Sequence, residues 1–193
     1  MMYSLILFLT CSTLVSATTY FLTVFAPNTE VDGTLLNAAA QGFYAGLSGP
    51  ETYCPQGVNC PNTQSSLVYA GLTAMAVEVP GGQAIYVAPL GQIAYTQAHS
   101  SYEPAGSFTG GWFNKTVLSD CDPTHEVLDF LPVDGSSSGG VKLCPQVEDY
   151  MAGTGASYRL YAGTAAFNLT GCIDAVGLTL HGVAEDFGCW QYT

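Results

Sequence analysis

The chain has 193 residues, 15 acidic and only 3 basic side chains, and a formal net charge of −12. Its basic residues, Lys115, Lys142 and Arg159, are scattered along the sequence. Neutralising nucleic-acid phosphates or an anionic membrane requires clustered cations. The composition therefore excludes nucleic acid and anionic membranes as partners, and it favours solubility over cation binding as the reason for the acidity.

Residues 1–17 are typical of a secretory signal peptide. A polar start leads into the apolar run Leu5–Leu9, and Val15-Ser16-Ala17 fits the small-residue rule for cleavage. The alternative, a membrane anchor, is disfavoured because the run is well short of the roughly 20 residues that span a bilayer. We therefore predict cleavage after Ala17 and a secreted domain over residues 18–193, with no membrane contact after cleavage.

The N-terminal third of the mature chain mixes strand and helix signals. Tyr20–Phe25 is rich in aromatic and β-branched residues and predicts a strand, as does Leu67–Tyr69. Between them, residues 35–47 place apolar side chains at helical spacing after Asp32, a candidate N-cap. Two glycines inside this segment weaken a helix. At most one short helix is expected here.

The clearest element is a three-stranded meander over residues 75–96. Met75–Val79 alternates apolar and other side chains, as a half-buried strand should. Pro80–Gly82 and Pro89–Gly91 supply turn residues on either side of a return strand, Ile85–Val87. Ile93–Thr96 is the third strand.

The C-terminal half continues the strand pattern. Further strands are expected at Ser107–Phe113, Glu126–Phe130, Val141–Leu143, Tyr158–Tyr161 and Ile173–Thr179. The Ser- and Gly-rich segment 134–140 is a surface loop, too short for a domain linker. The sequence predicts a single all-β domain, an antiparallel β-barrel or sandwich stabilised by disulfides.

Six cysteines remain after removal of the signal peptide. They are Cys54, Cys60, Cys121, Cys144, Cys172 and Cys189. An even number in an oxidising compartment predicts three disulfides, for which about fifteen connectivities are open. Cys54 and Cys60 are close in sequence, and each is followed by proline, which predicts a local bridge. No Cys-x-x-Cys pair is present, so the cysteines do not indicate a zinc site.

Two Asn-x-Thr sequons predict N-glycans. They are Asn114-Lys115-Thr116 and Asn168-Leu169-Thr170. In a secreted chain such sites lie on exposed turns or strand ends.

The histidines do not form a recognisable catalytic or metal motif. His99 is next to Ser100, but adjacent residues cannot easily aim at one another, and no Gly-x-Ser-x-Gly motif is present. We interpret His99 as structural, with its ring bonded to backbone groups at a strand end. His125 and His181 are isolated in the sequence. We assign no catalytic, metal-binding or cofactor-binding residue.

Several acidic residues lie close together in the sequence. These pairs are Asp120 with Asp122, Asp129 with Asp134, Glu148 with Asp149, and Glu185 with Asp186. Glycoside hydrolysis needs two carboxyl groups facing each other across a cleft, which sequence proximity does not provide. Surface charges and turn caps are the favoured interpretation, and a hydrolase is the least favoured alternative.

Aromatic residues offer a second alternative. Trp112, Trp190 and twelve tyrosines include enough flat side chains for a sugar-stacking platform. Aromatic residues of small β domains usually fill the core instead. An exposed coplanar row would favour sugar binding, whereas burial would favour a structural role.

Several stretches resemble a family of small secreted fungal proteins described as IgE-binding or PhiA-like cell-wall proteins. They are Tyr53-Cys54-Pro55, Cys60-Pro61, Val79–Gln83 with Tyr86-Val87, Gly91, Tyr95–Ser100, Gly110-Gly111, Leu143–Pro145, Gly171-Cys172 and Trp190–Thr193. The stretch from Val79 to Ser100 is the most specific. The resemblance implies a non-enzymatic secreted protein of the cell wall or extracellular space, with relatives that are allergen-like or elicitor-like.

The resemblance also orders the disulfides. The family has four recurrent cysteines, which correspond to Cys54, Cys60, Cys144 and Cys172. It therefore implies a Cys144–Cys172 bridge beside Cys54–Cys60, and it leaves Cys121 and Cys189 to pair with each other. Candidate partners are cell-wall polysaccharide and host proteins. The alternative function is a carbohydrate-binding module for cell-wall glycans.

Overall fold

The structure is a computed structural model that describes residues 19–61, 63–118 and 123–193. The predicted signal peptide, residues 1–17, and Cys121 lie outside the described residues. The described strands are β1 (Thr19–Phe25), β2 (Leu35–Ala39), β3 (Gly42–Ala45), β4 (Thr52–Tyr53), β5 (Val68–Tyr69), β6 (Ile85–Val87), β7 (Ile93–Tyr95), β8 (Trp112–Val117), β9 (His125–Phe130), β10 (Val141–Pro145), β11 (Tyr158–Ala162), β12 (Ile173–Ala175), β13 (Gly177–Val183) and β14 (Gln191–Tyr192). A single 3₁₀ turn, η1 (Asp149–Met151), is the only helical element among them, and no helix in the described part is long and apolar enough to cross a membrane.

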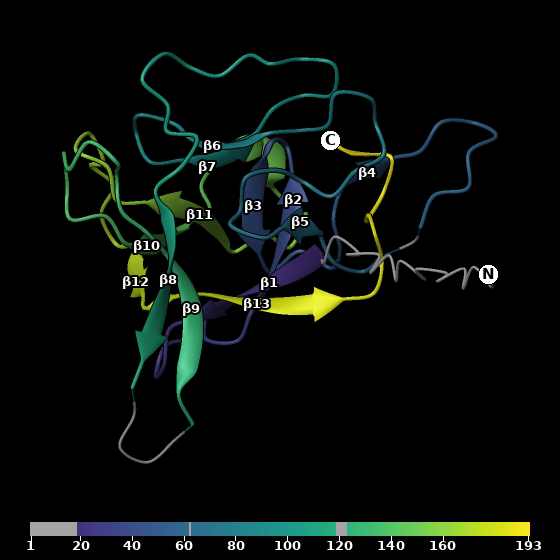
Figure 1. The fold of residues 1–193 in the computed structure, drawn as a ribbon. Helices are drawn as coiled ribbons and strands as arrows, with labels where there is room; N and C mark the ends of the chain where they lie inside the picture. Colours follow the sequence, from purple (N-terminus) through teal and green to yellow (C-terminus); the bar gives the residue numbers. More distant parts are fainter. Residues whose placement is uncertain (1–18, 62, 119–122) are drawn as a thin grey trace, which may run out of the picture.

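Twelve of the described strands form one antiparallel sheet in the order β12-β10-β11-β3-β2-β1-β13-β9-β8, with β5 on β1 and the β6–β7 hairpin on β3. This sheet curls into half a barrel, and the β8–β9 hairpin projects from its body (Figure 1). The long β1–β13 ladder pairs Thr19 with Val183 and Phe25 with Gly177. The predicted all-β class is confirmed, in the form of an open, curled sheet.

The main core fills one face of this sheet. Leu22, Leu36, Phe43, Leu143 and Leu160 are each at most 1% exposed and belong to one apolar cluster. Because side chains alternate along a strand, their sequence neighbours on β3, β10 and β11 point to the opposite face. This alternation explains why a second, smaller cluster forms there, as described below.

The predicted meander is only partly regular. β6 and β7 pair as expected, with Tyr86 opposite Ala94. Both predicted turns form, because the amide of Gly82 donates to Val79 O (2.9 Å) and that of Gly91 to Ala88 O (2.8 Å). The segment before them makes isolated bridges instead of a strand. Val68 pairs with Met75, Ala74 with Ala84, and Val77 with Cys189, so no single neighbour supports a continuous ladder.

The helix considered for residues 35–47 is wrong, because this segment is the β2–β3 hairpin. Ala40 and Gln41 form its two-residue loop with φ of 46° and 57°, the left-handed values of the turn that matches strand twist. Both sides of the hairpin are buried, so apolar residues occur on both and imitate helical spacing. Asp32 is not an N-cap; its Oδ1 accepts from the Ala26 amide at 2.8 Å.

The C-terminal strand is fastened by a polar clamp, which we define as Gln83, Tyr95, Thr96 and Tyr192. The Gln83 amide donates to Thr96 O (2.9 Å) and Tyr192 O (3.0 Å) and accepts from Tyr192 N (2.8 Å). The Tyr95 hydroxyl donates to Thr193 O at 2.9 Å. The Tyr192 hydroxyl accepts from the Leu67 amide at 2.7 Å. These bonds hold β14 against the main core.

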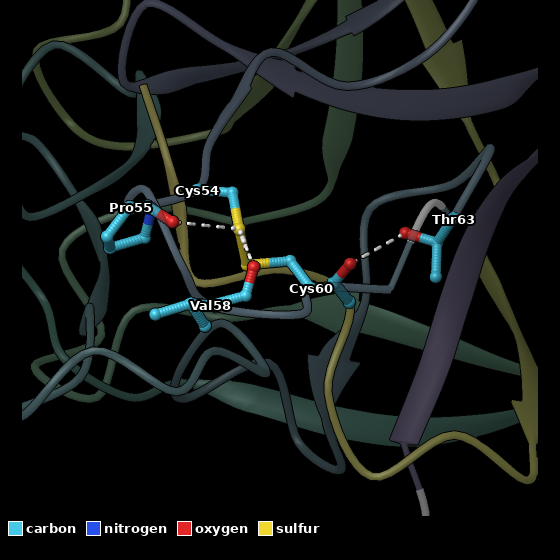
Figure 2. The surroundings of a disulfide bond; sticks show 6 residues. Cys54, Pro55, Val58, Cys60 and Thr63 are labelled. Atoms are coloured by element: carbon cyan, nitrogen blue, oxygen red, sulfur yellow. Dashed lines mark hydrogen bonds between the residues drawn. A yellow bond between two sulfur atoms is a disulfide. The ribbon is translucent and has the colours of Figure 1, made fainter.

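Two of the three expected disulfides are present. Cys54–Cys60 closes a loop beside β4, and Cys144–Cys172 joins β10 to the segment before β12. Figure 2 shows the first, with the Cys54 sulfur 3.4 Å from Val58 O and 3.8 Å from Pro55 O. These are contacts and not donated hydrogen bonds, because a disulfide sulfur carries no proton.

The expectation that Cys189 is disulfide-bonded is wrong for this structure. Cys189 is a free thiol, 2% exposed, and it belongs to the main core cluster. Its backbone pairs with Val77, which holds the side chain among apolar neighbours. Burial raises the pKa of the Cys189 thiol to about 12, against a smaller opposing effect of a hydrogen bond with Tyr192.

Candidate functional site

The candidate site begins with Arg159, the only arginine of the chain. Arg159 lies on β11, directly opposite Tyr44 on β3 and Cys144 on β10. Since Leu160 and Phe43 belong to the main core, Arg159 and Tyr44 point to the opposite face of the sheet. There Tyr44 forms the second apolar cluster with Ala39 and Met151.

The guanidinium of Arg159 is held on several sides. Its Nη1 donates to Glu148 Oε1 at 2.5 Å and lies 3.4 Å from the Tyr150 hydroxyl. The guanidinium also lies over the rings of Tyr44 and Tyr161, 5.6 and 5.7 Å from their centroids. The Arg159 side chain is 13% exposed and that of Glu148 25%. The ion pair is therefore largely desolvated, with its geometry fixed by the aromatic rings.

One polar atom of this arrangement lacks a partner. Arg159 Nε is buried and makes no hydrogen bond within the described part of the chain. Gly42 lies beneath it, and a Cβ at that position would come within 3.3 Å of Nε and 3.1 Å of the Tyr44 ring. Gly42 therefore allows the arginine and the tyrosine to lie close against β3.

The local electrostatics keep the tyrosines neutral and the arginine charged. Burial raises the pKa of Tyr44, and its hydrogen bond with Tyr150 acts in the same direction. Burial also raises the pKa of Tyr86, with a further contribution from the negative charge of Glu103. For Arg159, burial opposes the charge, but Tyr44 and the Glu148 carboxylate outweigh it and the pKa is raised.

A pocket of about 510 Å³ lies beside the guanidinium; we refer to it as the Arg159 pocket. It is lined by Ala40, Gln41, Tyr86, Ala88, Pro89, Leu90, Gln92, Ala94, Pro104 and Arg159. The pairing of Tyr86 with Ala94 places both on one face of the β6–β7 hairpin. The small side chains of Ala88 and Ala94 leave room that larger residues would fill. The hollow therefore results from residue size at alternate strand positions.

The chemistry of the Arg159 pocket suits a neutral, hydroxyl-bearing ligand. Glu148 already compensates the arginine charge, so the pocket offers no free cation to an anion. Gln41 and Gln92 supply amide donors and acceptors, while Tyr86 supplies an aromatic wall. Tyr102, which is 75% exposed, lies near enough to Tyr86 to affect its pKa.

The interpretation of His99 as a bonded structural histidine is wrong. The His99 side chain is exposed and makes no hydrogen bond with the described residues. Its backbone has φ of 61° in a turn that the Ser100 amide closes onto Gln97 O at 3.1 Å. The turn directs the ring outward, away from the backbone groups that the prediction assigned to it.

The aromatic residues divide between core and surface. Tyr44, Tyr95 and Tyr192 are buried, in agreement with the favoured structural interpretation. Trp112 is half-buried and packs edge-on against Phe130, with centroids 5.3 Å apart, so it belongs to the edge of the main core and not to an exposed coplanar row. The most exposed tyrosines are Tyr53, Tyr102 and Tyr150, at 51%, 75% and 59%.

The remaining sequence candidates lie on the surface or in ion pairs. Both sequon asparagines, Asn114 and Asn168, are exposed. Among the acidic pairs, Asp129 bonds Lys115 at 3.0 Å and Glu148 bonds Arg159, while Asp120 and Asp122 lie outside the described residues. No group of three or more metal-ligating side chains forms within the described residues.

The Arg159 pocket was not found from the sequence. Its residues come from the β2–β3 turn, the β6–β7 hairpin, the segment between β7 and β8, and β11, which are far apart in the chain. The sequence contained one signal: the only arginine lies in a predicted strand, between Tyr158 and Tyr161. Burying a charged side chain is costly, so an arginine in such a strand indicates a specific role. Glu148 and Tyr150 carried no pattern that would connect them to it.

These features define a disulfide-stabilised all-β protein. No family model and no solved structure matches the chain. A protein of Arthroderma benhamiae, named as an uncharacterized secreted protein, is 32% identical over 171 residues, which span 85% of this chain and 80% of the relative. The chain belongs to the family of that protein, a family of secreted fungal proteins, and it is itself an extracellular protein.

Proposed function

We propose that this is a non-enzymatic protein of the fungal cell wall or extracellular space, with an allergen-like or elicitor-like role at the host surface. One observation carries the proposal: every basic side chain is ion-paired with a carboxylate. The pairs are Lys115 with Asp129, Lys142 with Asp174, and Arg159 with Glu148. These three carboxylates serve the fold, so Glu148, which is bound to the arginine of the Arg159 pocket, is not free to meet a substrate there as a hydrolase would require.

The stretches that resemble PhiA-like wall proteins support the same proposal. Val79–Gln83 ends on the clamp residue Gln83, and Tyr95–Ser100 begins with Tyr95 and Thr96, both in the clamp. The shared sequence is therefore explained by fastening of the C-terminal strand. A shared, stable scaffold is therefore enough to explain why these stretches resemble one another.

The experiment combines fractionation with an activity assay. Protein secreted by the fungus is separated into medium and washed wall, and each fraction is probed for the mature chain. We expect the chain in these fractions and no release of reducing sugar from β-glucan or chitin by purified protein. Sugar release that the Glu148→Gln variant loses would overturn the non-enzymatic proposal, and confinement inside cells would overturn the location.

A second candidate function is binding of a neutral cell-wall glycan at the Arg159 pocket. The favouring observation is the position of exposed tyrosines: the Tyr150 hydroxyl lies 3.4 Å from Arg159 Nη1, and Tyr102 lies near enough to Tyr86 to raise its pKa. Aromatic faces beside amide groups suit the apolar faces and hydroxyl edges of sugar rings.

Filling the pocket tests this candidate. Ala88→Leu adds volume without removing a polar contact, and Ala105→Leu, at an exposed loop position, is the matched control. We expect wild-type protein and Ala105→Leu to be retained on insoluble β-glucan or chitin, and Ala88→Leu to lose about tenfold in affinity, equivalent to about 1.4 kcal/mol. Equal retention of all three proteins would contradict binding at this pocket.

A further inference from the structure

Asn114 shares one face of the sheet with aromatic and apolar side chains. On β8, Trp112 and Asn114 are two residues apart and therefore point to the same side. Across the ladder, Trp112 is opposite Phe130 and Asn114 is opposite Leu128, both of which belong to the main core. The sequon asparagine thus stands at the open end of the core face.

A groove of about 390 Å³ lies in front of this asparagine; we refer to it as the Trp112 groove. It is lined by Tyr20, Ala70, Gly71, Trp112, Phe113, Asn114, Glu126, Val127, Leu128 and Leu180. The ladders explain the grouping, because Leu128 pairs with Leu178, two residues from Leu180, and Leu180 pairs with Leu22, two residues from Tyr20. Tyr20, Trp112 and Leu180 are only partly buried against the core.

We propose that Asn114 carries an N-glycan whose first sugar packs into the Trp112 groove. The sequon Asn114-Lys115-Thr116 is complete, and the asparagine side chain is exposed, as attachment requires. A pyranose ring has an apolar C–H face that fits Trp112, Tyr20 and Leu180, which would otherwise remain partly in water. The glycan thereby closes the open end of the main core.

Polar groups at the rim match the hydroxyl edge of the sugar. Glu126 lines the groove and accepts a hydrogen bond from Thr116 Oγ1 at 2.5 Å, which leaves carboxylate lone pairs for sugar hydroxyls. The groove therefore combines an apolar wall and a hydrogen-bonding rim within reach of one attachment point. The proposed occupant of the groove is the glycan on Asn114, so no separate partner molecule is required.

The second sequon provides a natural contrast. Asn168 lies in an irregular, exposed segment and does not line the groove. A glycan at Asn168 is expected to extend into solvent. The proposal thus concerns one sequon of the two, and it predicts unequal effects for otherwise identical modifications.

The experiment uses the full chain, secreted from a yeast host and purified from the medium. Glycopeptide mapping should find Asn114 occupied. Asn114→Gln should lower Tm by about 2–4 °C, whereas Asn168→Gln should change it by less than about 1 °C. Enzymatic trimming to a single N-acetylglucosamine should preserve the Tm of the fully glycosylated protein, because the first sugar makes the contact.

Tryptophan fluorescence locates the contact. Acrylamide should quench Asn114→Gln more than the glycosylated protein, and this difference should vanish when both proteins also carry Trp112→Phe, since Trp190 then reports alone. An empty sequon, equal Tm for the two asparagine variants, or a quenching difference that survives Trp112→Phe would each overturn the proposal. Rescue of Asn114→Gln by a free cell-wall oligosaccharide, with no effect of the attached glycan, would make the groove an external sugar site and would also overturn it.

Discussion

The polar clamp and the Arg159 pocket both bury polar groups, but they complete their hydrogen bonds differently. In the clamp, Gln83 is 1% exposed and uses both amide atoms, bonding two carbonyl groups and one backbone amide. At the pocket, the Arg159 guanidinium is ion-paired at Nη1, but its buried Nε has no partner among the described residues. The Arg159 guanidinium also lines a cavity of about 510 Å³.

This difference distinguishes a polar network that stabilises the fold from a polar group that could contact a ligand. A buried polar network with every bond formed stabilises and specifies one arrangement of the chain. A buried charge that is fixed in position but incompletely bonded, next to an open cavity, has the properties of a binding site. The comparison therefore links Gln83, Tyr95 and Tyr192 to the stability of the fold, and it makes Arg159 the residue next to which the proposed glycan binding would occur.

The largest expected effect is loss of the clamp. Gln83→Ala leaves Thr96 O and both backbone groups of Tyr192 buried without partners, which should cost about 3 kcal/mol of unfolding free energy. For a domain of this size, Tm should fall by about 6–12 °C in calorimetry. Gln56→Ala, at an exposed position, is the control and should be neutral. An equal fall in Tm for the two variants would show that the hydrogen bonds of the clamp do not stabilise the fold.

The next effect compares two ion pairs. Glu148→Gln leaves the largely buried Arg159 guanidinium without its carboxylate and should lower the unfolding free energy by about 1–3 kcal/mol. Asp174→Asn breaks the pair with Lys142, but the Asp174 side chain is 77% exposed, so the change should be below about 1 kcal/mol. Urea unfolding of both variants measures the contrast, and equal midpoints would show that burial does not distinguish the pairs.

A smaller effect depends on pH and concerns Cys189. Its folded pKa of about 12 is above the ordinary value of 9.0, so the stabilisation from the neutral thiol is fully present below about pH 9 and is lost as pH rises toward 12. Between pH 8 and pH 10.5, the unfolding free energy of wild type should therefore fall by about 2 kcal/mol more than that of Cys189→Ala.

Urea unfolding at a series of pH values measures this difference. Both proteins contain the same buried tyrosines, so the titration of these tyrosines affects both. Iodoacetamide should label Cys189 in denaturant and not in the native protein, because the thiol is buried. A Cys189 peptide that stays disulfide-linked without reductant would contradict the free thiol.

The smallest effect concerns His99, outside both regions. Its side chain is exposed and its φ of 61° favours glycine, so His99→Gly should raise the unfolding free energy by up to about 1 kcal/mol. His99→Ala should leave Tm within about 1 °C of wild type. A clear loss of Tm in His99→Ala would restore the structural role that the exposed ring argues against.

Local chemistry determined what the sequence predicted correctly. The turn residues Pro80–Gly82 and Pro89–Gly91 form the expected turns, and the nearby Cys54 and Cys60 are bridged. The resemblance to the fungal family gave the Cys144–Cys172 pair, which spacing left open. The turn residues and the Cys54–Cys60 pair are close together in the chain, and Cys144 and Cys172 correspond to cysteines that recur in the family.

Only the tertiary structure decided the rest. Residues 35–47 have helical spacing, yet they form a hairpin because the curled sheet buries both of its faces. Cys189 is a free thiol within the main core, where its backbone bridges to Val77. Arg159 on β11 binds Glu148 of the β10–β11 connection and lines a pocket with Tyr86 of β6, which is far away in the sequence. Composition and periodicity report the environment of each residue, whereas strand register decides which residues meet, and register follows from packing of the whole sheet.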